Sequence, residues 1–216
     1  MPARFDLSLY LVTDPAMTAR RGLVETVAAA VDGGVTLVQL RHKDGPFRLM
    51  VETGRALMVR LAPHGIPLIV NDRLDVVHAI GAAGVHVGQD DLPPAAVRAL
   101  LGPRAIIGLS ITREEELGTF DPATVDYVGL GPIFSTGTKA DAAVALGPAV
   151  FASIRSQLRC PVVAIGGITG ANAAQAIAAG ADGIAVVSAI CGAADPRAAA
   201  HALRAAVDSC RKAGIS

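Results

Sequence analysis

The sequence predicts a single-domain α/β protein of the TIM-barrel class, a (β/α)₈ barrel that spans residues 1–216. Short aliphatic runs alternate eight times with Ala- and Leu-rich stretches in which apolar residues recur at helical spacing. The chain is 52% hydrophobic but only 3% aromatic, so its core is built from Ala, Val, Leu and Ile. Such a core suits parallel strands that are buried on both faces. With 216 residues, the chain can just form this barrel if its loops are short.

Each repeat consists of one expected strand and the helical stretch that follows it. The expected strands occupy residues 9–13, 36–41, 67–71, 84–87, 106–110, 127–131, 162–165 and 183–187. The expected helices occupy residues 22–32, 47–62, a short segment ending at 80, 93–101, 113–120, 148–157, 172–179 and 196–212. The longest connection is 134–146, and a loop of that length in a compact barrel is usually functional.

Charge and composition exclude several classes of partner. The formal net charge is +0, which favours neither nucleic acid nor an acidic membrane surface as a partner. The three cysteines, Cys160, Cys191 and Cys210, are widely spaced and lack a C-x-x-C pair, so we expect free thiols. No secretory leader or membrane-spanning stretch is visible, and we therefore expect a cytoplasmic protein. Whether it forms a homo-oligomer is left open.

Two aspartates, Asp72 and Asp91, follow the third and fourth expected strands. The carboxyl ends of all strands in a closed parallel barrel meet at one rim, where active sites are built. Two carboxylates at that rim can share a Mg²⁺ ion, which prefers oxygen ligands. The alternative is that each aspartate caps the helix after it. We favour the metal site because cations are expected at the same rim.

Those cations are Arg41, Lys43 and Lys139. Arg41 and Lys43 alternate along an extended segment and therefore leave it on the same side, whereas His42 points the other way. Three cations at one rim suit a polyanion such as a diphosphate. Solvated surface charges, or a structural ion-pair network with the aspartates, remain the alternatives.

Uncharged groups at the rim indicate a phosphate and a heterocycle. Gly166-Gly167 and Ser188 follow the seventh and eighth strands, whose loops commonly bind phosphate in TIM barrels, although a plain tight turn would look the same. Gln39, Asn71 and Ser110 at strand ends suit a nitrogen heterocycle. We expect the other strand histidine, His86, to be a packed or surface residue rather than a catalyst.

Together these clusters resemble the thiamine-phosphate synthase family over almost the whole chain. The motifs occur in the order Gln39-Leu40-Arg41-His42-Lys43, Asn71-Asp72-Arg73, Gly88-Gln89-Asp90-Asp91, Gly131-Pro132-Ile133-Phe134, Thr136-Gly137-Thr138-Lys139 and Gly166-Gly167-Ile168. The resemblance implies a TIM-barrel transferase of thiamine biosynthesis. It would join hydroxymethylpyrimidine diphosphate to thiazole phosphate and release pyrophosphate.

The resemblance also implies a role for each matching residue. Asp72 and Asp91 would ligate Mg²⁺. The pyrimidine diphosphate site would comprise Gln39, Leu40, Arg41, His42, Lys43, Asn71, Ser110 and Lys139, and the catalytic residues would be Arg41, Lys43, Ser110 and Lys139. The thiazole phosphate site would comprise Thr136, Gly137, Thr138, Gly167, Val187 and Ser188.

Two other functions remain as alternatives. A thiazole tautomerase or regulatory paralogue of the same fold would want a histidine after the fifth strand, where this chain has Thr112. A different phosphate-binding barrel would explain Gly167 and Ser188 but would leave the aspartates without a role. The sequence also departs from the family at Ile111-Thr112, where relatives often have Thr-His, and in the Ala-rich stretch 140–145.

Overall fold

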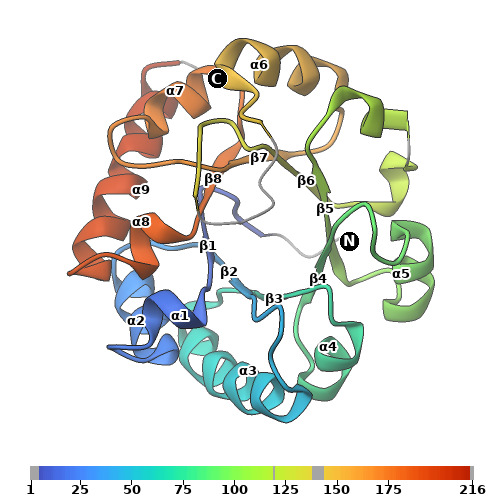
Figure 1. Cartoon of the computed structure of the whole chain (residues 1–216), viewed down its shortest axis with the longest axis vertical. Coiled ribbons are helices and arrows are strands. Elements are labelled where there is room, and N and C mark those ends of the chain that lie inside the picture. Colours follow the sequence, from blue (N-terminus) through green and yellow to red (C-terminus); the bar gives the residue numbers. More distant parts are fainter. Residues whose placement is uncertain (1–4, 119, 138–143, 215–216) are drawn as a thin grey trace.

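The computed structural model describes residues 5–118, 120–137 and 144–214. Eight parallel strands form one closed barrel, and their order in space follows their order in the chain (Figure 1). The strands are β1 (Leu9–Val12), β2 (Leu37–Leu40), β3 (Leu68–Asn71), β4 (Gly84–Val87), β5 (Ile106–Ile111), β6 (Tyr127–Leu130), β7 (Val162–Ile165) and β8 (Gly183–Val186). The predicted TIM barrel is confirmed, because every expected strand is present to within one residue at each end.

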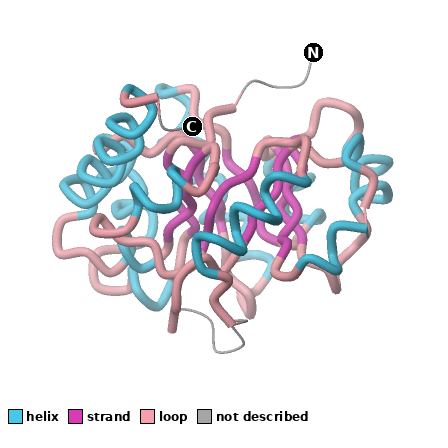
Figure 2. Tube along the Cα trace, turned by 90° about the horizontal axis from the view of Figure 1, so that it is seen from above, coloured by secondary structure: helices cyan, strands magenta, loops and turns pink. Residues whose placement is uncertain are grey.

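Helices surround the barrel on its outside (Figures 1 and 2). The longer ones are α2 (Leu23–Asp32), α3 (Phe47–Leu61), α4 (Leu74–Ile80), α5 (Pro94–Leu101), α6 (Gly147–Gln157), α7 (Ala173–Ala178) and α9 (Pro196–Lys212). Two short helices, α1 (Pro15–Thr18) and α8 (Ser188–Cys191), follow β1 and β8 directly. Each short helix has four residues, too few to show a helical period in the sequence.

The expected helix over residues 113–120 is wrong. The chain there forms two 3₁₀ turns, η2 (Glu114–Gly118) and η3 (Pro122–Thr124); a third, η1 (Ala62–His64), follows α3. The Glu116 carboxylate turns back and accepts hydrogen bonds from the Thr112 backbone N–H at 2.7 Å and the Thr112 hydroxyl at 2.9 Å. These local bonds favour a tight turn over a helix.

Apolar side chains pack in two places, inside the barrel and between the barrel and the helices. Side chains of a strand point alternately inward and outward, so each strand serves both cores. The cluster inside the barrel contains Leu7, Tyr10, Leu37, Ile69, Ile106, Tyr127, Val163 and Ala185. The outer core includes Leu9, Leu11 and Val38, all fully buried. Burial on both faces explains why the strands are continuous aliphatic runs.

Two matching ion pairs fasten helices to the amino ends of strands. Arg98 on α5 lies 2.7 Å from Oδ2 of Asp126, which also accepts a 2.7 Å bond from the Ile107 backbone N–H. Arg155 on α6 lies 3.0 Å from Oδ2 of Asp182, which accepts a 2.7 Å bond from the first backbone N–H of β7. Both pairs lie at the end of the barrel opposite the predicted rim.

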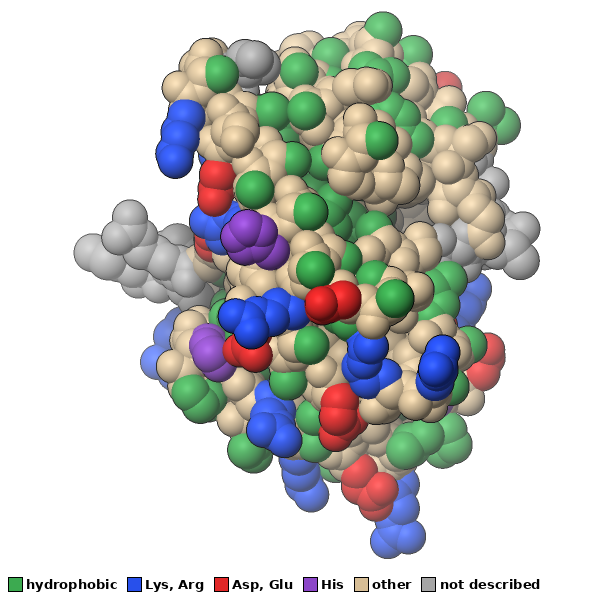
Figure 3. Space-filling view, turned by 90° about the vertical axis from the view of Figure 1, so that its left-hand side faces the viewer, with side chains coloured by type: hydrophobic (Ala, Val, Ile, Leu, Met, Phe, Trp, Pro, Cys, Tyr) green, Lys and Arg blue, Asp and Glu red, His purple; other side chains and the backbone are tan. Residues whose placement is uncertain are grey.

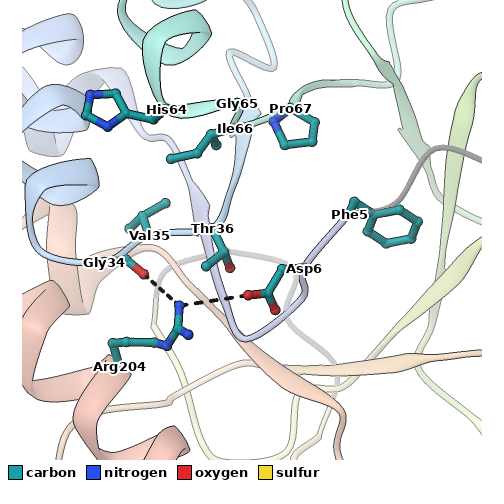
Figure 4. A pocket seen from close by; sticks show the side chains of 10 residues that line it. All are labelled: Phe5, Asp6, Gly34, Val35, Thr36, His64, Gly65, Ile66, Pro67 and Arg204. Carbon is teal, nitrogen blue, oxygen red and sulfur yellow. Dashed lines mark hydrogen bonds and ion pairs between the residues drawn. The ribbon is translucent and has the colours of Figure 1, made fainter.

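A cavity of about 570 Å³ opens at that same amino-terminal end. Its lining residues precede β1, β2 and β3, and Figure 4 shows Arg204 reaching across it to Asp6 and to the Gly34 carbonyl oxygen. The Arg204–Asp6 contact is 3.8 Å and the contact to Gly34 is 3.5 Å. Conserved features at this end of a TIM barrel serve stability, and the active site lies at the other end.

The outer surface mixes charges of both signs. On the face in Figure 3, Lys and Arg side chains are interspersed with Asp and Glu, as a net charge of +0 suggests. All three cysteines are free thiols, as expected, with Cys191 buried and the other two half-buried. Within the described part of the chain, no helix is both long and apolar enough to cross a membrane.

Candidate active site

The two predicted metal ligands, Asp72 and Asp91, are brought together at the carboxyl ends of β3 and β4. Burial, together with the charge and hydrogen bond of the adjacent Asp91, raises the pKa of Asp72 to about 6. The Asn71 side chain and the Arg41 charge partly oppose this rise. The two carboxyl groups therefore face each other, with Arg41 near them.

Backbone geometry aims Asp72 at this meeting point. Its φ of 59° makes it the only residue other than glycine with a positive φ in the described ranges. Asp tolerates this conformation better than most residues, but it still stores strain, which is typical of functional sites. Asn71 Nδ2 donates to Asp72 Oδ2 at 2.6 Å, and Asp91 Oδ2 accepts from the Gly88 backbone N–H at 2.7 Å.

The helix-cap alternative for these aspartates is wrong. The residue that precedes α4 is Arg73 and the residue that precedes α5 is Pro93, and neither helix receives a side-chain cap. The two carboxyl groups instead interact with each other. Each offers oxygen atoms of the kind that Mg²⁺ prefers, so the pair fits a divalent cation.

The structure describes two of the three predicted cations, Arg41 and Lys43. Arg41 is half-buried directly after β2, and its backbone N–H donates to Thr13 Oγ1 at 3.0 Å. Lys43, two residues further along, is exposed. Lys139 and Thr138 lie outside the described residues, so the predicted contacts of these two side chains stay predictions.

Leu40 and His42 point away from this cluster. Both line an apolar pocket between α1 and α3, together with Met50 and Leu49. The sequence argument from alternation assigned His42 to the opposite side from Arg41, and the structure agrees. The structure therefore groups Arg41 with the aspartates and leaves the side chains of Leu40 and His42 on the outer face of the barrel.

A chain of hydrogen bonds crosses the barrel below the rim and joins two predicted site residues, Gln39 and Ser110. Gln39 Nε2 donates to the Tyr10 hydroxyl at 2.7 Å, which lies 2.8 Å from the Tyr127 hydroxyl. Tyr127 is 2.9 Å from His86 Nδ1, and His86 Nε2 is 2.9 Å from Ser110 Oγ. Gln39, Tyr10, Tyr127 and His86 are buried and Ser110 is half-buried.

Sequence reasoning missed three members of this chain. It treated His86 as a packed residue, which its burial confirms, but it did not foresee that both ring nitrogens are hydrogen-bonded. Tyr10 and Tyr127 are the only tyrosines of the sequence, and both occur inside strands. A buried tyrosine needs a partner for its hydroxyl, and this was the available signal.

Glycines shape the loop after β7 in the way the sequence suggested. Gly166 and Gly167 have φ values of 98° and 65°. A Cβ at Gly167 would lie 2.4 Å from the Ser135 carbonyl oxygen, so this position must be glycine for the loop after β6 to approach. Asn172 steadies the turn by donating to the Gly167 carbonyl oxygen at 2.9 Å.

The remaining residues of the predicted thiazole phosphate site lie around this turn and after β8. Thr136 is half-buried and Gly137 exposed in the loop after β6. Val187 precedes α8, whose first residue is the exposed Ser188. Backbone N–H groups at glycine turns and helix starts are common phosphate ligands in TIM barrels.

The fold and the rim define the class of protein as a TIM-barrel enzyme with an acidic pair beside a cation and with a hydrogen-bonded polar network below the rim. The family model described as thiamine monophosphate synthase matches residues 9–190. A thiamine-phosphate synthase of Azorhizobium caulinodans is 56% identical over 212 residues, which cover 98% of this chain and 100% of the relative. One of Xanthobacter autotrophicus is 56% identical over 211 residues, with the same coverage of 98% and 100%.

Solved structures agree with these relatives. The thiamine phosphate pyrophosphorylase of Pyrococcus furiosus superposes with a TM-score of 0.85 at 37% identity, covering 94% of this chain and 96% of that one. A 3-hexulose-6-phosphate synthase superposes with a TM-score of 0.64 at 19% identity, over 92% of this chain and 99% of that one, and shares the fold alone. The chain belongs to the thiamine monophosphate synthase family.

Proposed function

We propose that this protein joins hydroxymethylpyrimidine diphosphate to thiazole phosphate, forming thiamine monophosphate and pyrophosphate. The observation that carries the proposal is the meeting of Asp72 and Asp91 beside Arg41 in a chain that is 56% identical to a thiamine-phosphate synthase over 98% of its length. A fold alone would not define the reaction, because TIM barrels host many activities.

Asp72 and Asp91 would hold a Mg²⁺ ion between their carboxylates. Their oxygen donors, mutual proximity and access to the rim suit a hard cation that keeps substrate phosphate among its ligands. When bound, the ion supplies positive charge that stabilises the departing diphosphate. Burial and, after it, the repulsion from Asp91 raise the pKa of Asp72, and such an ion would relieve the repulsion.

Arg41 and Lys43 would bind the diphosphate and stabilise the negative charge that grows on it. The bond between the pyrimidine CH₂ carbon and the diphosphate oxygen breaks, and its electron pair leaves with the diphosphate. The electron-rich aminopyrimidine delocalises the positive charge left on carbon, so bond breaking runs ahead of attack. Preorganised cations at the leaving group are the largest contribution expected in such a site. Lys139 is assigned the same role.

The thiazole ring nitrogen then forms the new C–N bond. Its phosphate would be anchored by Gly167, Val187 and Ser188, and Thr136, Gly137 and Thr138 of the loop after β6 are assigned to the same site. Holding both substrates in line converts an encounter of two molecules into a reaction within one complex. The reaction needs no protein nucleophile.

The tautomerase alternative is not favoured. It would want a histidine after β5, and Thr112 is found there instead, with its hydroxyl donating to the Glu116 carboxylate at 2.9 Å. Glu116 is itself occupied by the Thr112 backbone N–H at 2.7 Å. The Thr112 hydroxyl is therefore engaged by Glu116.

The test is to mix both substrates with Mg²⁺ and to measure thiamine monophosphate and pyrophosphate. Activity should vanish in excess EDTA and return with added Mg²⁺. Asp91→Asn should abolish turnover, whereas Asp90→Asn, an exposed neighbour with no assigned role, should retain it. Absence of both products in the wild-type reaction would reject the function, and full turnover in EDTA would reject the metal role.

A further inference from the structure

The orientation assigned to the Gln39 amide, with Nε2 toward Tyr10, leaves the chain of hydrogen bonds between Gln39 and Ser110 one arrangement of its hydrogens. Gln39 presents its amide Nε2 to Tyr10, so it must donate and the Tyr10 oxygen must accept. The Tyr10 hydrogen then has one acceptor among the described residues, the Tyr127 oxygen 2.8 Å away. Tyr127 in turn must donate to His86 Nδ1 at 2.9 Å.

This order of donors and acceptors determines which ring nitrogen of His86 carries the proton. A ring nitrogen that accepts a hydrogen bond carries no proton, so the single proton of the neutral imidazole lies on Nε2. Nε2 therefore donates to Ser110 Oγ across 2.9 Å. With Gln39 donating, the reverse order would leave the buried Tyr10 hydrogen without an acceptor. An unsatisfied buried donor is costly.

We infer that Tyr10, Tyr127 and His86 are positioning residues that set the direction of hydrogen bonding at the two ligand-facing ends of this chain. Ser110 accepts from His86, so its own hydrogen is available to donate to a ligand. Gln39 uses its amide nitrogen on Tyr10, so its carbonyl oxygen Oε1 is available to accept. The site thus presents one donor and one acceptor with fixed roles.

This arrangement selects for a class of ligand. A donor and an acceptor of fixed direction fit a heterocycle that carries both a ring nitrogen with a lone pair and an exocyclic amino group. An oxo-pyrimidine, which presents a carbonyl and a ring N–H instead, would face the wrong partner at one end or both. The specificity for the amino form, which rests on the function proposed above, follows from residues that lie beneath Gln39 and Ser110.

Three further observations support a built network rather than a chance contact. A Cβ at Gly108 on β5 would lie 2.4 Å from both the Tyr127 hydroxyl oxygen and His86 Nδ1, so this glycine makes the space in which they meet. Burial also raises the pKa of both tyrosines, so each keeps the hydroxyl hydrogen that it must pass along. Tyr10 and Tyr127 further pack edge to face, with ring centroids 5.8 Å apart.

The direct test is the tautomer of His86 in the free protein. ¹⁵N-labelled imidazole resonances of wild type, assigned by their loss in His86→Asn, should show an unprotonated Nδ1 and a protonated Nε2 near neutral pH. A protonated Nδ1, as the other tautomer or as imidazolium, would overturn the inference. The experiment needs no substrate, so its outcome is independent of whether the coupling reaction occurs.

The second test asks whether Tyr127 acts through Ser110. Tyr127→Phe and Ser110→Ala should each lower kcat/KM for the pyrimidine diphosphate by about tenfold, the value of one hydrogen bond. The double variant should lose no more than Ser110→Ala alone, because the upstream hydroxyl has nothing left to orient. Losses that multiply would show independent roles and would refute the inference. Tyr10→Phe replaces Tyr127→Phe in the same cycle if the latter does not fold.

Thr26→Val is the matched control. Thr26 is also a buried hydroxyl residue, but it donates only within its own turn, to the Gly22 carbonyl oxygen at 2.7 Å. Its loss should leave kcat/KM for both substrates unchanged. An equal loss in Thr26→Val would show that removing any buried hydroxyl has the same effect, and would likewise refute the role of the network.

Discussion

Asn71 donates a 2.6 Å hydrogen bond from Nδ2 to Oδ2 of Asp72, the next residue along the chain. The bond lies where β3 ends, and it stabilises the ionised form of a carboxylate that burial and Asp91 destabilise. Asn71 therefore offsets part of the electrostatic cost of placing two acids together. The site remains strained, since the pKa of Asp72 still rises to about 6.

Asp72→Asn should raise the thermal stability of the metal-free protein while it abolishes turnover. The folded-state pKa of about 6 exceeds the ordinary value of 3.8, so the native state binds the proton more tightly than the unfolded state does. The protonated Asp72 carboxyl therefore contributes to the free energy of unfolding at low pH, and this contribution is lost as the pH rises through about 6. The gain in Tm should therefore be clear at about pH 8 and absent at about pH 4, as measured by melting in EDTA.

Asp75→Asn provides a control of opposite sign. The Arg73 side chain holds the pKa of Asp75 below its ordinary value, with Nη2 and Oδ2 2.6 Å apart. Removing this charge should leave turnover intact and should not raise the Tm at any pH. A lower Tm for Asp72→Asn at about pH 8 would contradict the repulsion between the two site aspartates.

Gly167→Ala should raise the KM for thiazole phosphate more than the KM for the pyrimidine diphosphate. The new Cβ would lie 2.4 Å from the Ser135 carbonyl oxygen at a φ of 65°, so the loop after β6 must move away. Steady-state kinetics with each substrate varied in turn measure the effect. Gly170 lies with Gly167 in the loop after β7, and a Cβ at Gly170 would have no atom within 4 Å. Gly170→Ala should therefore behave like wild type. An effect confined to the pyrimidine substrate would mean that the two subsites are reversed.

Asp126→Ala should destabilise the fold by about 1–3 kcal/mol, because the Ile107 backbone N–H loses its acceptor and Arg98 loses its carboxylate partner. The side chains of Arg98 and Asp126 are only 21% and 18% exposed, so solvent screens the pair weakly. Urea unfolding measures the loss. Glu52→Gln, which breaks an ion pair between side chains that are 91% and 65% exposed, should change stability by less than about 0.5 kcal/mol. Equal losses of stability in Asp126→Ala and Glu52→Gln would contradict the structural role of the Arg98–Asp126 pair.

Glu116→Gln should destabilise the protein at neutral pH but not in acid. Burial opposes ionisation of Glu116, but the hydrogen bonds from Thr112 and Arg113 outweigh it and lower the pKa below the ordinary value of 4.5. The carboxylate therefore contributes stability above that value, and the contribution disappears as the pH falls through the lowered pKa. Chemical unfolding of both proteins at about pH 7 and about pH 3 measures the difference. A penalty of the same size at both values would contradict the shift.

The sequence by itself determined the barrel and the rim. Eight aliphatic runs alternating with helical periods predict parallel strands, and the closed order β1 to β8 follows from short right-handed connections. Because the carboxyl ends of such strands share one rim, residues as distant as Arg41, Asp72 and Asp91 could be grouped before any coordinates were known. The sequence-based prediction was wrong at residues 113–120. It expected a helix there because it did not take into account that the Glu116 side chain folds back onto Thr112.

Tertiary structure decided which side chains face one another inside that frame. Strand alternation placed Arg41 and His42 on opposite sides, but only the closed barrel brought Tyr127 within hydrogen-bond distance of both Tyr10 and His86. These contacts join strands that are far apart in sequence, and they depend on the space left by Gly108. Sequence periodicity shows which residues lie on the same face of one helix or strand. The direction of a buried hydrogen bond depends instead on partners that come from other strands across the core.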